Sequence, residues 1–580
     1  MLSVLGKLGW FFRLEWKRYA IALALLLLCG LLEMIPPRLV GDTIDRIQQG
    51  KLTGELLAQT LALLIGITII IYVMTYVWMR KLFGGSFVVE RMLRSRLMRH
   101  FLKMAPPFYE KHRTGDLMAR ATNDLKDVSM TAGFGILTLM DSTVWMIALL
   151  VVMSTTISWK LTLAAVLPLP VLAVSMQVLG RRIHARFKSA QDAFGQMNDG
   201  VLETVSGTRV IRAFAQEREA ERRFMDVTAD VLAKNIAVAR IDALFEPVIK
   251  IVVGTSYLIG LVYGAYLVFR SELTVGALVS FNVYLGMLIW PMFAIGELIN
   301  IMQRGSASLD RVNETLSYPP DVEEPPHPER LAEPGTIEFR NVSFRYPSSE
   351  TDNLRNIDIV LEPGRTLGIV GRTGSGKTTL VRQLLREYPS PRGSILISGR
   401  PIETLAFDDL KRWIGYVPQQ PFLFSRTVRE NILFAVGEEG AGRLEEAIDL
   451  SALRNDLAFL PNGLDTLVGE QGVALSGGQK QRVSIARAWI ADPPILILDD
   501  ALSAVDAKTE AAIVGNIRRA RRGKTTLIVT HRLSAVQHAD EIIVLDNGVV
   551  TERGTHEQLL AQGGWYREQW ERQQSAPKEP

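Results

Sequence analysis

Six apolar runs in the first 317 residues constrain this chain more than any other feature of its sequence. Each run is long enough to cross a hydrocarbon core of about 30 Å as a helix. The remaining residues have ordinary globular composition, so the mean hydropathy of +0.15 averages two environments. We expect six membrane spans with approximate bounds Ala20–Val40, Leu56–Trp78, Thr131–Ile157, Leu161–Gly180, Leu244–Phe269 and Val275–Ile301.

Basic residues set the orientation of these spans. The loop between the third and fourth runs has one cation, Lys160, whereas the segment between the second and third runs is rich in cations. Cytoplasmic loops are the basic ones, so we expect this segment, the N-terminus and the soluble half to be cytosolic, in a multi-pass protein of the cell membrane. The cations of that segment are Arg80, Lys81, Arg91, Arg94, Arg96, Arg99, Lys103, Lys111, Arg113, Arg120 and Lys126.

Three further features bound the function. Residues 1–19 are amphipathic and lack a cleavage site, which predicts an interfacial helix leading into the first span instead of a signal peptide. The single cysteine, Cys29, excludes a disulfide within the chain and gives a redox role no support. Cytosolic cations near the membrane account for the net charge of +4, so no nucleic-acid partner is expected.

The chain is too long for one core and divides by composition. A proline-rich and acidic stretch over residues 318–335 reads as a linker. From Thr336 onward β-rich segments alternate with helical ones, which predicts a mostly parallel sheet. The fold class is therefore an α-helical membrane domain over 1–317 fused to an α/β phosphate-loop domain over 336–580, and the latter is expected to be nucleotide-binding.

A G-x-x-x-x-G-K-T motif predicts the ATP site. It follows the apolar segment Leu367–Val370 and opens a helix, which is the context that such a motif requires. Glycines let successive backbone amides face the phosphates, and a lysine supplies a cation. The expected nucleotide-binding residues of this loop are Gly371, Arg372, Thr373, Gly374, Ser375, Gly376, Lys377, Thr378 and Thr379.

Residues farther along the chain complete this site. The Thr378 hydroxyl, the Asp499 carboxylate at the end of an apolar strand and the Gln419 amide are expected to hold Mg²⁺. Tyr346 is predicted to stack on adenine, with a core tyrosine as the alternative interpretation. His531 is predicted to contact the γ-phosphate, with a structural histidine as the alternative.

A second motif, Ser476-Gly477-Gly478-Gln479, follows Leu475 and opens another helix with free amides. Helix N-termini of this kind bind phosphate, and nothing in the sequence requires that phosphate to be held by the same chain. A third motif follows, the apolar segment Ile495–Leu498 with Asp499 and Asp500 at its end. The order of the three motifs argues against an unrelated protein with a chance phosphate loop.

This constellation resembles ATP-binding cassette (ABC) exporters of the half-transporter type. The resemblance implies a dimer that holds two ATP molecules, each between the phosphate loop of one subunit and the Ser476–Gln479 motif of the other. It also implies that Arg113–Asp124 and the stretch around Gly207 form coupling helices. By the same resemblance Ser503–Asp506 crosses between subunits, and Val468–Gly472 links the cassette to the membrane domain.

The sequence departs from the family at Asp500, where a glutamate normally polarises the attacking water. Aspartate is one methylene shorter, which withdraws the carboxylate by roughly 1 Å and can cost about 10²-fold in rate. The pattern resembles the subunit of heterodimeric bacterial multidrug exporters whose catalytic base is degenerate. We therefore expect a different partner chain carrying glutamate, and a homodimer that compensates for aspartate is the alternative.

The expected function is ATP-driven export of hydrophobic or amphiphilic compounds, including cationic ones. Asp500, His531 and Gln419 are its expected catalytic residues. The alternatives are a nucleotide-gated regulatory or sensor subunit, or a lipid or peptide exporter, while an importer fits poorly. Aromatic and methionine side chains of the spans are candidates for the substrate lining: Tyr72, Tyr76, Trp78, Trp145, Met146, Tyr284, Met287, Trp290, Met292 and Phe293. The ionisable residues Glu33, Asp141, Glu246, Lys250 and Glu297 are also candidates, although Glu246 and Lys250 are spaced to pair with each other.

Overall fold

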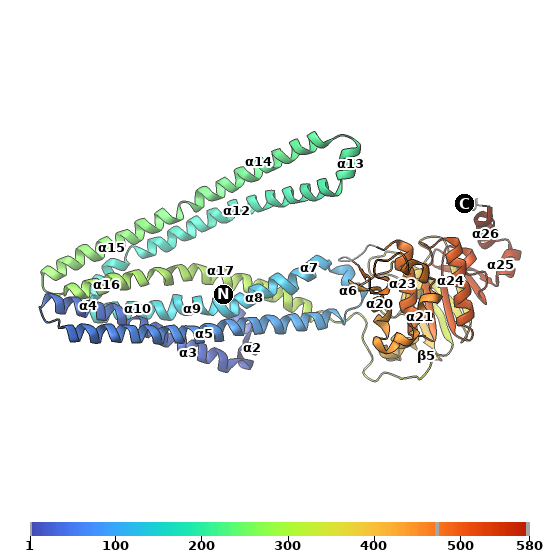
Figure 1. The fold of residues 1–580 in the computed structure, drawn as a ribbon, viewed down its shortest axis with the longest axis horizontal. Coiled ribbons are helices and arrows are strands. Elements are labelled where there is room, and N and C mark those ends of the chain that lie inside the picture. The colour runs from blue at the N-terminus through green and yellow to red at the C-terminus, as the bar shows by residue number, and fades with distance from the viewer. Residues whose placement is uncertain (1–2, 470–474, 576–580) are drawn as a thin grey trace. The chain divides into compact units, whose positions relative to one another are not determined.

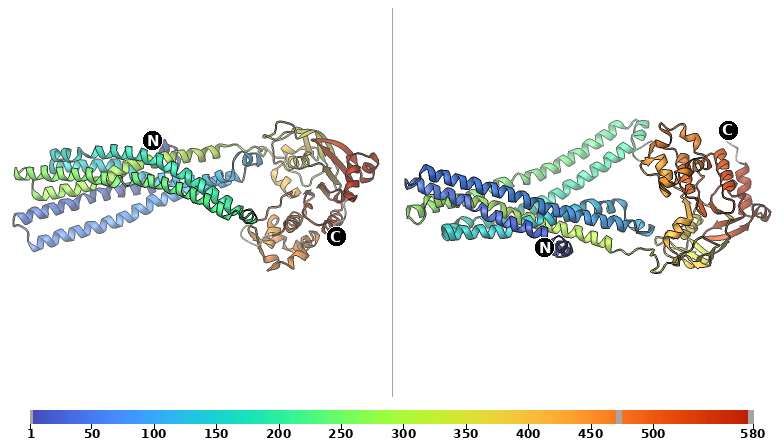
Figure 2. Two further views of the ribbon diagram at one scale, coloured as in Figure 1. Left: turned by 90° about the horizontal axis from the view of Figure 1, so that it is seen from above. Right: turned by 60° about the horizontal axis from the view of Figure 1, so that its bottom comes forward.

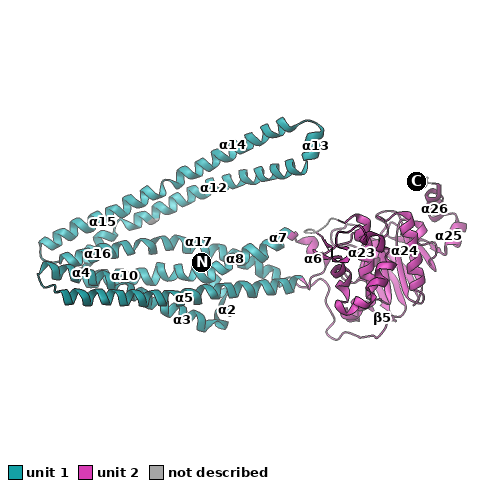
Figure 3. Cartoon of the chain, viewed as in Figure 1, with its two compact units in different colours: residues 1–101, 115–318 teal, residues 102–114, 319–580 magenta. Residues whose placement is uncertain are grey.

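A computed structural model describes residues 3–469 and 475–575. The described chain divides into two compact units, residues 1–101 with 115–318 and residues 102–114 with 319–580 (Figure 3). The fold class is confirmed, since the first unit is helical and the second contains β-sheets flanked by helices (Figure 1).

The first unit is built from long helices (Figure 1). Three π-helical turns interrupt its third predicted span, at Thr131–Gly135, Asp141–Trp145 and Met153–Ser158, and a fourth precedes it at Arg120–Asp124. Its α-helices are α1 (Ser3–Lys7), α2 (Gly9–Leu14), α3 (Trp16–Glu33), α4 (Ile35–Gln48), α5 (Gly54–Phe101), α7 (Thr114–Ala119), α8 (Leu125–Met130), α9 (Ile136–Met140), α10 (Met146–Val152), α11 (Trp159–Val166), α12 (Leu169–Ser206), α13 (Thr208–Ala213), α14 (Glu217–Asp242), α15 (Phe245–Phe269), α16 (Val275–Met287) and α17 (Ile289–Ser317).

The number of spans is not settled by helix length and composition. Within the described residues, five helical stretches are long and apolar enough to cross a membrane. The predicted run Leu161–Gly180 is divided between α11 and α12 by a turn at Leu167 and Pro168. Proline disfavours a helical conformation in the residue that precedes it, which accounts for a break at this place. Six spans therefore remain a prediction.

The N-terminal segment packs on other helices of its unit, and its interfacial position remains a prediction. Leu8 and Phe11 are fully buried in a cluster with residues of α3, α5 and α17, and Lys7 forms a 2.6 Å ion pair with Asp310. The apolar face of α1 and α2 is thus largely covered by protein, because the neighbouring helices offer it an apolar surface.

Two short helices lie near the stretches that the family resemblance marks as coupling segments. Helix α13 lies between α12 and α14, which run side by side in Figures 1 and 2. The other, α6 (Pro106–Lys111), begins at two prolines and precedes the expected stretch Arg113–Asp124, which is helical from Thr114 onward; the coupling role of this stretch remains a prediction. Proline at the first helical positions favours this earlier start.

The second unit contains two main sheets. The larger has the order β12-β11-β3-β10-β9-β6, parallel except for β12, and the smaller, antiparallel sheet has the order β2-β1-β4-β5. The strands are β1 (Ile337–Phe344), β2 (Leu354–Leu361), β3 (Thr366–Gly371), β4 (Arg392–Ile397), β5 (Arg400–Pro401), β6 (Ile414–Val417), β7 (Arg426–Thr427), β8 (Leu467–Val468), β9 (Ile495–Asp499), β10 (Thr525–Val529), β11 (Glu541–Asp546) and β12 (Val549–Gly554).

Helices cover these sheets, and two apolar clusters form the core. One cluster joins residues of both sheets around Trp413, which is 1% exposed, and the other fills the space between the parallel sheet and α23. The helices are α18 (Lys377–Leu384), α19 (Phe407–Trp413), α20 (Val428–Ile432), α21 (Leu444–Leu450), α22 (Arg454–Leu457), α23 (Gly477–Ile490), α24 (Ala507–Ala520), α25 (His556–Gln562) and α26 (Trp565–Ser575).

Candidate functional site

The phosphate loop connects the end of β3 to the start of α18. Gly371 and Gly376 have φ angles of +148° and +102°. A Cβ atom at Gly371 would lie 2.1 Å from the Leu545 carbonyl oxygen, and one at Gly376 would lie 2.8 Å from that of Asn353. Only glycine fits this backbone, which leaves the loop amides available for an anion.

Polar groups of the loop are poised for phosphate. The Lys377 ammonium donates to the backbone carbonyls of Gly371 and Arg372 at 2.9 and 2.8 Å. Burial lowers the pKa of Lys377, and the carboxylates of Asp500 and Asp499 oppose this shift. The Ser375 hydroxyl is buried without a hydrogen-bond partner among the described residues, which is the state expected of a group that binds an absent ligand.

Two oxygen donors meet where Mg²⁺ is expected. The Thr378 hydroxyl donates to the Asp499 carboxylate at 3.0 Å, and the Tyr416 hydroxyl donates to the other oxygen of Asp499 at 3.3 Å. Asp499 ends β9 and is 1% exposed, and this burial raises its pKa. Among the described residues, no group of three or more acids, histidines or cysteines gathers to bind a metal. A site with few protein oxygens beside the predicted phosphate loop fits Mg²⁺. This ion usually keeps several waters and binds phosphate oxygens in addition to one or two protein ligands.

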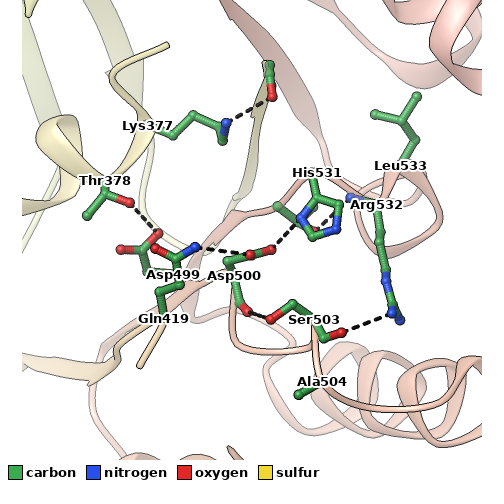
Figure 4. A network of polar contacts seen from close by, with 12 residues as sticks. Lys377, Thr378, Gln419, Asp499, Asp500, Ser503, Ala504, His531, Arg532 and Leu533 are labelled. Carbon is green, nitrogen blue, oxygen red and sulfur yellow. Dashed lines mark hydrogen bonds and ion pairs between the residues drawn. The ribbon is translucent and has the colours of Figure 1, made fainter. Parts of the chain in front are cut away.

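Asp500 lies between the two other predicted catalytic residues (Figure 4). One carboxylate oxygen is 2.9 Å from Nδ1 of His531, and the other accepts a 3.4 Å hydrogen bond from the Gln419 amide. Asp500 has a φ of +49°, a conformation that aspartate tolerates better than most residues. Asp500 thus contacts both of the other residues predicted to be catalytic.

The hydrogen bond that protonated His531 donates to the Asp500 carboxylate raises the pKa of His531. A histidine pKa that is higher in the folded than in the unfolded state stabilises the protein below the ordinary histidine pKa, and this contribution is lost as the pH rises through the folded pKa. We therefore expect Asp500→Asn to lower the thermal unfolding midpoint more at pH 6 than at pH 9. Equal losses at both pH values would show that the pair does not titrate.

Tyr346 is placed beside the loop. Its hydroxyl lies 3.1 Å from that of Thr379, and its ring makes an edge contact with Tyr388 at 4.9 Å between ring centroids. In the same unit the Tyr388 hydroxyl donates to the Glu110 carboxylate, which places α6 against this aromatic group. Adenine stacking on Tyr346 remains a prediction.

The second motif lies at the start of α23, apart from the phosphate loop. Ser476 caps α23, receiving a hydrogen bond from the Gln479 amide while the Gln479 side chain accepts one from the Ser476 backbone. Gln481 binds Ser503 and Ala504, so the start of α23 and the loop after Asp500 form one surface. No hydrogen bond between described residues joins Ser476–Gln479 to the phosphate loop. The predicted Val468–Gly472 segment lies largely outside the described residues.

Sequence reasoning missed the contribution of α26. A cavity of about 510 Å³ is lined by Gly371, Arg372, Thr373, Asp500 and His531 and by Trp565, Glu568, Gln569 and Arg572 of α26. The side-chain amide of Gln573 bridges the backbone of His531 and Leu533. It donates to the His531 carbonyl at 2.8 Å and accepts from the backbone N–H of Leu533 at 2.9 Å. A polar helix at the end of a chain carries no motif, so no sequence signal identified these residues.

Gln573 is therefore expected to act as a positioning residue for His531. Gln573→Ala removes both hydrogen bonds, and loosening a catalytic group by about 1 Å can cost up to 10²-fold in turnover. We expect roughly a tenfold fall in kcat with little change in KM for ATP, measured in the Asp500→Glu background. The exposed neighbour Gln574 provides the matched control as Gln574→Ala. An equal loss in both variants would assign α26 a general structural role.

Comparisons with known proteins agree with this arrangement. Residues 19–292 match the family described as the ABC transporter transmembrane region, and residues 354–503 match the family described as ABC transporter. The chain is 61% identical to the probable multidrug resistance ABC transporter ATP-binding/permease protein YheI of Bacillus subtilis (strain 168), over 99% of this chain and 98% of that protein. It is 42% identical to the multidrug resistance-like ATP-binding protein MdlA of Escherichia coli (strain K12), over 99% and 97% of the two chains.

A solved structure shares the fold. The ATP-bound structure of a bacterial Atm1-family ABC exporter superposes with a TM-score of 0.79 at 25% identity, covering 96% of this chain and 99% of that one.

Proposed function

Because this chain belongs to the ABC transporter family, we propose that it exports hydrophobic or amphiphilic compounds, including cationic ones, by alternating access driven by ATP. The family assignment makes it a multi-pass membrane protein with ATPase activity coupled to transport and a cytosolic nucleotide-binding domain. The names of the two relatives support multidrug compounds as the cargo.

The site residues suggest how ATP is used. The backbone of Gly371–Gly376 and the Lys377 cation would hold the phosphates, and Ser375 would gain its missing partner there. Thr378, Asp499 and Gln419 would hold Mg²⁺, which when bound supplies positive charge to the phosphate oxygens. Asp500 would orient the attacking water, and His531 would contact the γ-phosphate. Tyr346 would face the adenine.

The observation that carries the rest of the proposal is an aspartate at the base position beside an otherwise complete site. The capping box at Ser476 is intact, so this chain can complete a nucleotide site in a second chain. We propose a heterodimer in which the partner carries glutamate at the position of Asp500. Its site would hydrolyse ATP quickly, while the site built on Lys377 of this chain would turn over slowly.

Transport by inverted membrane vesicles tests the proposal. Vesicles containing this chain and a partner of the glutamate type should accumulate a fluorescent amphiphile when supplied with ATP, and Ser476→Ala in this chain should reduce uptake by removing the cap opposite the partner's nucleotide. A chain that transports equally well without this partner would exclude the heterodimer.

A nucleotide-gated regulatory subunit is the second candidate, favoured by the same Asp500. In that case ATP occupancy would change the membrane domain without cargo movement. The absence of vesicle uptake in the complex, together with an ATP-dependent conformational change, would support it over an exporter.

A further inference from the structure

A cavity of about 370 Å³ lies within the helical unit, among side chains of α3, α5, α9, α10, α17 and the π-helical turn between α9 and α10. Its lining combines two carboxylates with three tryptophans in an otherwise largely apolar wall. The lining residues are Leu26, Leu27, Cys29, Gly30, Leu31, Glu33, Thr75, Trp78, Leu137, Met140, Asp141, Val144, Trp145, Ala148 and Trp290. Volumes of this order accommodate a small organic molecule.

The two carboxylates are not equivalent. Asp141 accepts a 2.9 Å hydrogen bond from the indole nitrogen of Trp290. Glu33 makes no hydrogen bond or ion pair with any described residue, and it interacts electrostatically with Asp141. By contrast, Glu246 outside the cavity forms a 2.7 Å ion pair with Lys250, as its spacing predicts. Among the described lining residues there are therefore two acids and no cation to balance them.

The tryptophans add independent features. Trp78 is 7% exposed, and its indole nitrogen finds no hydrogen-bond acceptor among the described residues. The Cys29 thiol, a weak acceptor, interacts with this indole. Trp145 packs so closely on Gly30 that a Cβ there would lie 2.6 Å from the indole ring. Asp141 and Trp145 begin and end one π-helical turn, and such turns are frequent at functional sites.

We propose that this cavity binds a lipophilic organic cation, with Glu33 as the charge partner and the indole rings as its walls. Ionisable groups inside a membrane domain are costly and tend to face a cavity or a partner. A cation beside aromatic faces gains further electrostatic attraction, whereas a small metal ion would find too few ligands here. Asp141 holds Trp290 in place through its hydrogen bond and adds negative charge. The inference rests on the proposed export function and names the substrate class and its recognition site.

Binding to the intact chain tests the site. The probe is tetraphenylphosphonium, and its comparison is tetraphenylborate, which has nearly the same shape and the opposite charge. Both are titrated into the full chain in lipid nanodiscs, alone and with its partner, and quenching of tryptophan fluorescence is measured after subtraction of empty nanodiscs. We expect the cation to bind at least tenfold more tightly than the anion. Equal affinities would reduce the cavity to a hydrophobic pocket and overturn the proposal.

Three variants separate the roles of the lining residues. Glu33→Gln should weaken tetraphenylphosphonium binding at least tenfold and narrow the difference from tetraphenylborate. Asp141→Asn keeps a hydrogen-bond acceptor for Trp290. It should lower the affinity for tetraphenylphosphonium through the loss of negative charge alone. Trp290→Phe keeps an aromatic ring but loses the hydrogen bond to Asp141, and should weaken both probes.

Glu246→Gln is the matched control, because it removes a membrane-domain carboxylate that is already paired. Unchanged cation binding in Glu33→Gln, or an equal loss in Glu246→Gln, would contradict the assignment. The charge comparison on the unmodified chain decides the proposal even if a variant fails to fold.

The site and the transport function can fail separately. Suppose that the chain exports another compound but binds the two probes without a charge preference. The export proposal would then be supported and the proposed cation site contradicted. Charge-selective binding that depends on Glu33, without ATP-dependent uptake of tetraphenylphosphonium into inverted vesicles, would keep the site and contradict export.

Discussion

Replacing Asp500 by glutamate is expected to raise ATP turnover of the purified chain in lipid by roughly 10²-fold. The added methylene moves the carboxylate outward by about 1 Å, toward the position that a base needs to polarise water on the γ-phosphate, and a displacement of this size can change a rate by that factor. Gln419 and His531 already contact Asp500. The feature that the site lacks is therefore a side chain at position 500 long enough to contact the attacking water.

The backbone makes the same change slightly unfavourable for folding. Asp500 has a φ of +49°, a region in which aspartate is enriched and longer side chains are not. We expect the variant to lose up to about 1 kcal/mol of stability while gaining activity. Asp492 has the same φ of +49° and lies at the turn before β9, so Asp492→Glu introduces the same backbone cost away from the phosphate loop.

The outcome bears directly on the heterodimer. A gain only in Asp500→Glu would show that the chain assembles complete nucleotide sites that lack an adequate base, as an asymmetric pair requires. Robust turnover by the unmodified chain would contradict the degenerate site and favour a homodimeric exporter. Phosphate release under saturating ATP and Mg²⁺ measures either result.

Replacing Asp499 by asparagine is expected to lower turnover by about 10³-fold, or ~4 kcal/mol in activation free energy. Asparagine retains the shape of the side chain and can still accept from Thr378, but it removes the negative charge that would face Mg²⁺. Because Asp499 is 1% exposed, solvent cannot replace that charge.

The measurement requires an active starting point, so Asp499→Asn is made in the Asp500→Glu background. Calorimetry should show that the affinity for ATP depends less on Mg²⁺, with metal-free ATP binding retained. Asp492→Asn is the control, since Asp492 pairs with Lys524 and Arg443 away from the phosphate loop. Unchanged Mg²⁺ dependence in Asp499→Asn would remove Asp499 from the metal site.

The contiguous parts of the nucleotide site were predictable from sequence. Gly371–Thr378 is predicted to bind phosphate largely through its own backbone, and a conformation that only glycine adopts requires glycine at fixed places in consecutive residues. The alternation of strands and helices after Thr336 predicted the parallel sheet, because the spacing of apolar residues in each element is readable from neighbouring residues in the chain. The apolar runs likewise reported the membrane domain through composition alone.

Other features required the tertiary structure. The packing of Phe11 depends on helices that are distant in sequence, whereas the break at Leu167 and Pro168 and the start of α6 follow from local prolines. Gln573 contacts the backbone of His531 and Leu533 from α26, a polar helix whose sequence contains no recognisable motif.

The sequence by itself determined that this chain has a membrane domain and an ATP site with an unusual aspartate. Only the tertiary structure decided which side chains meet: Asp500 between Gln419 and His531, and Glu33 with Asp141 and the indoles in one cavity. The physical reason is that backbone conformation and hydropathy are set by neighbouring residues in the chain, whereas a contact between distant residues is fixed by which helix faces and strand ends pack together.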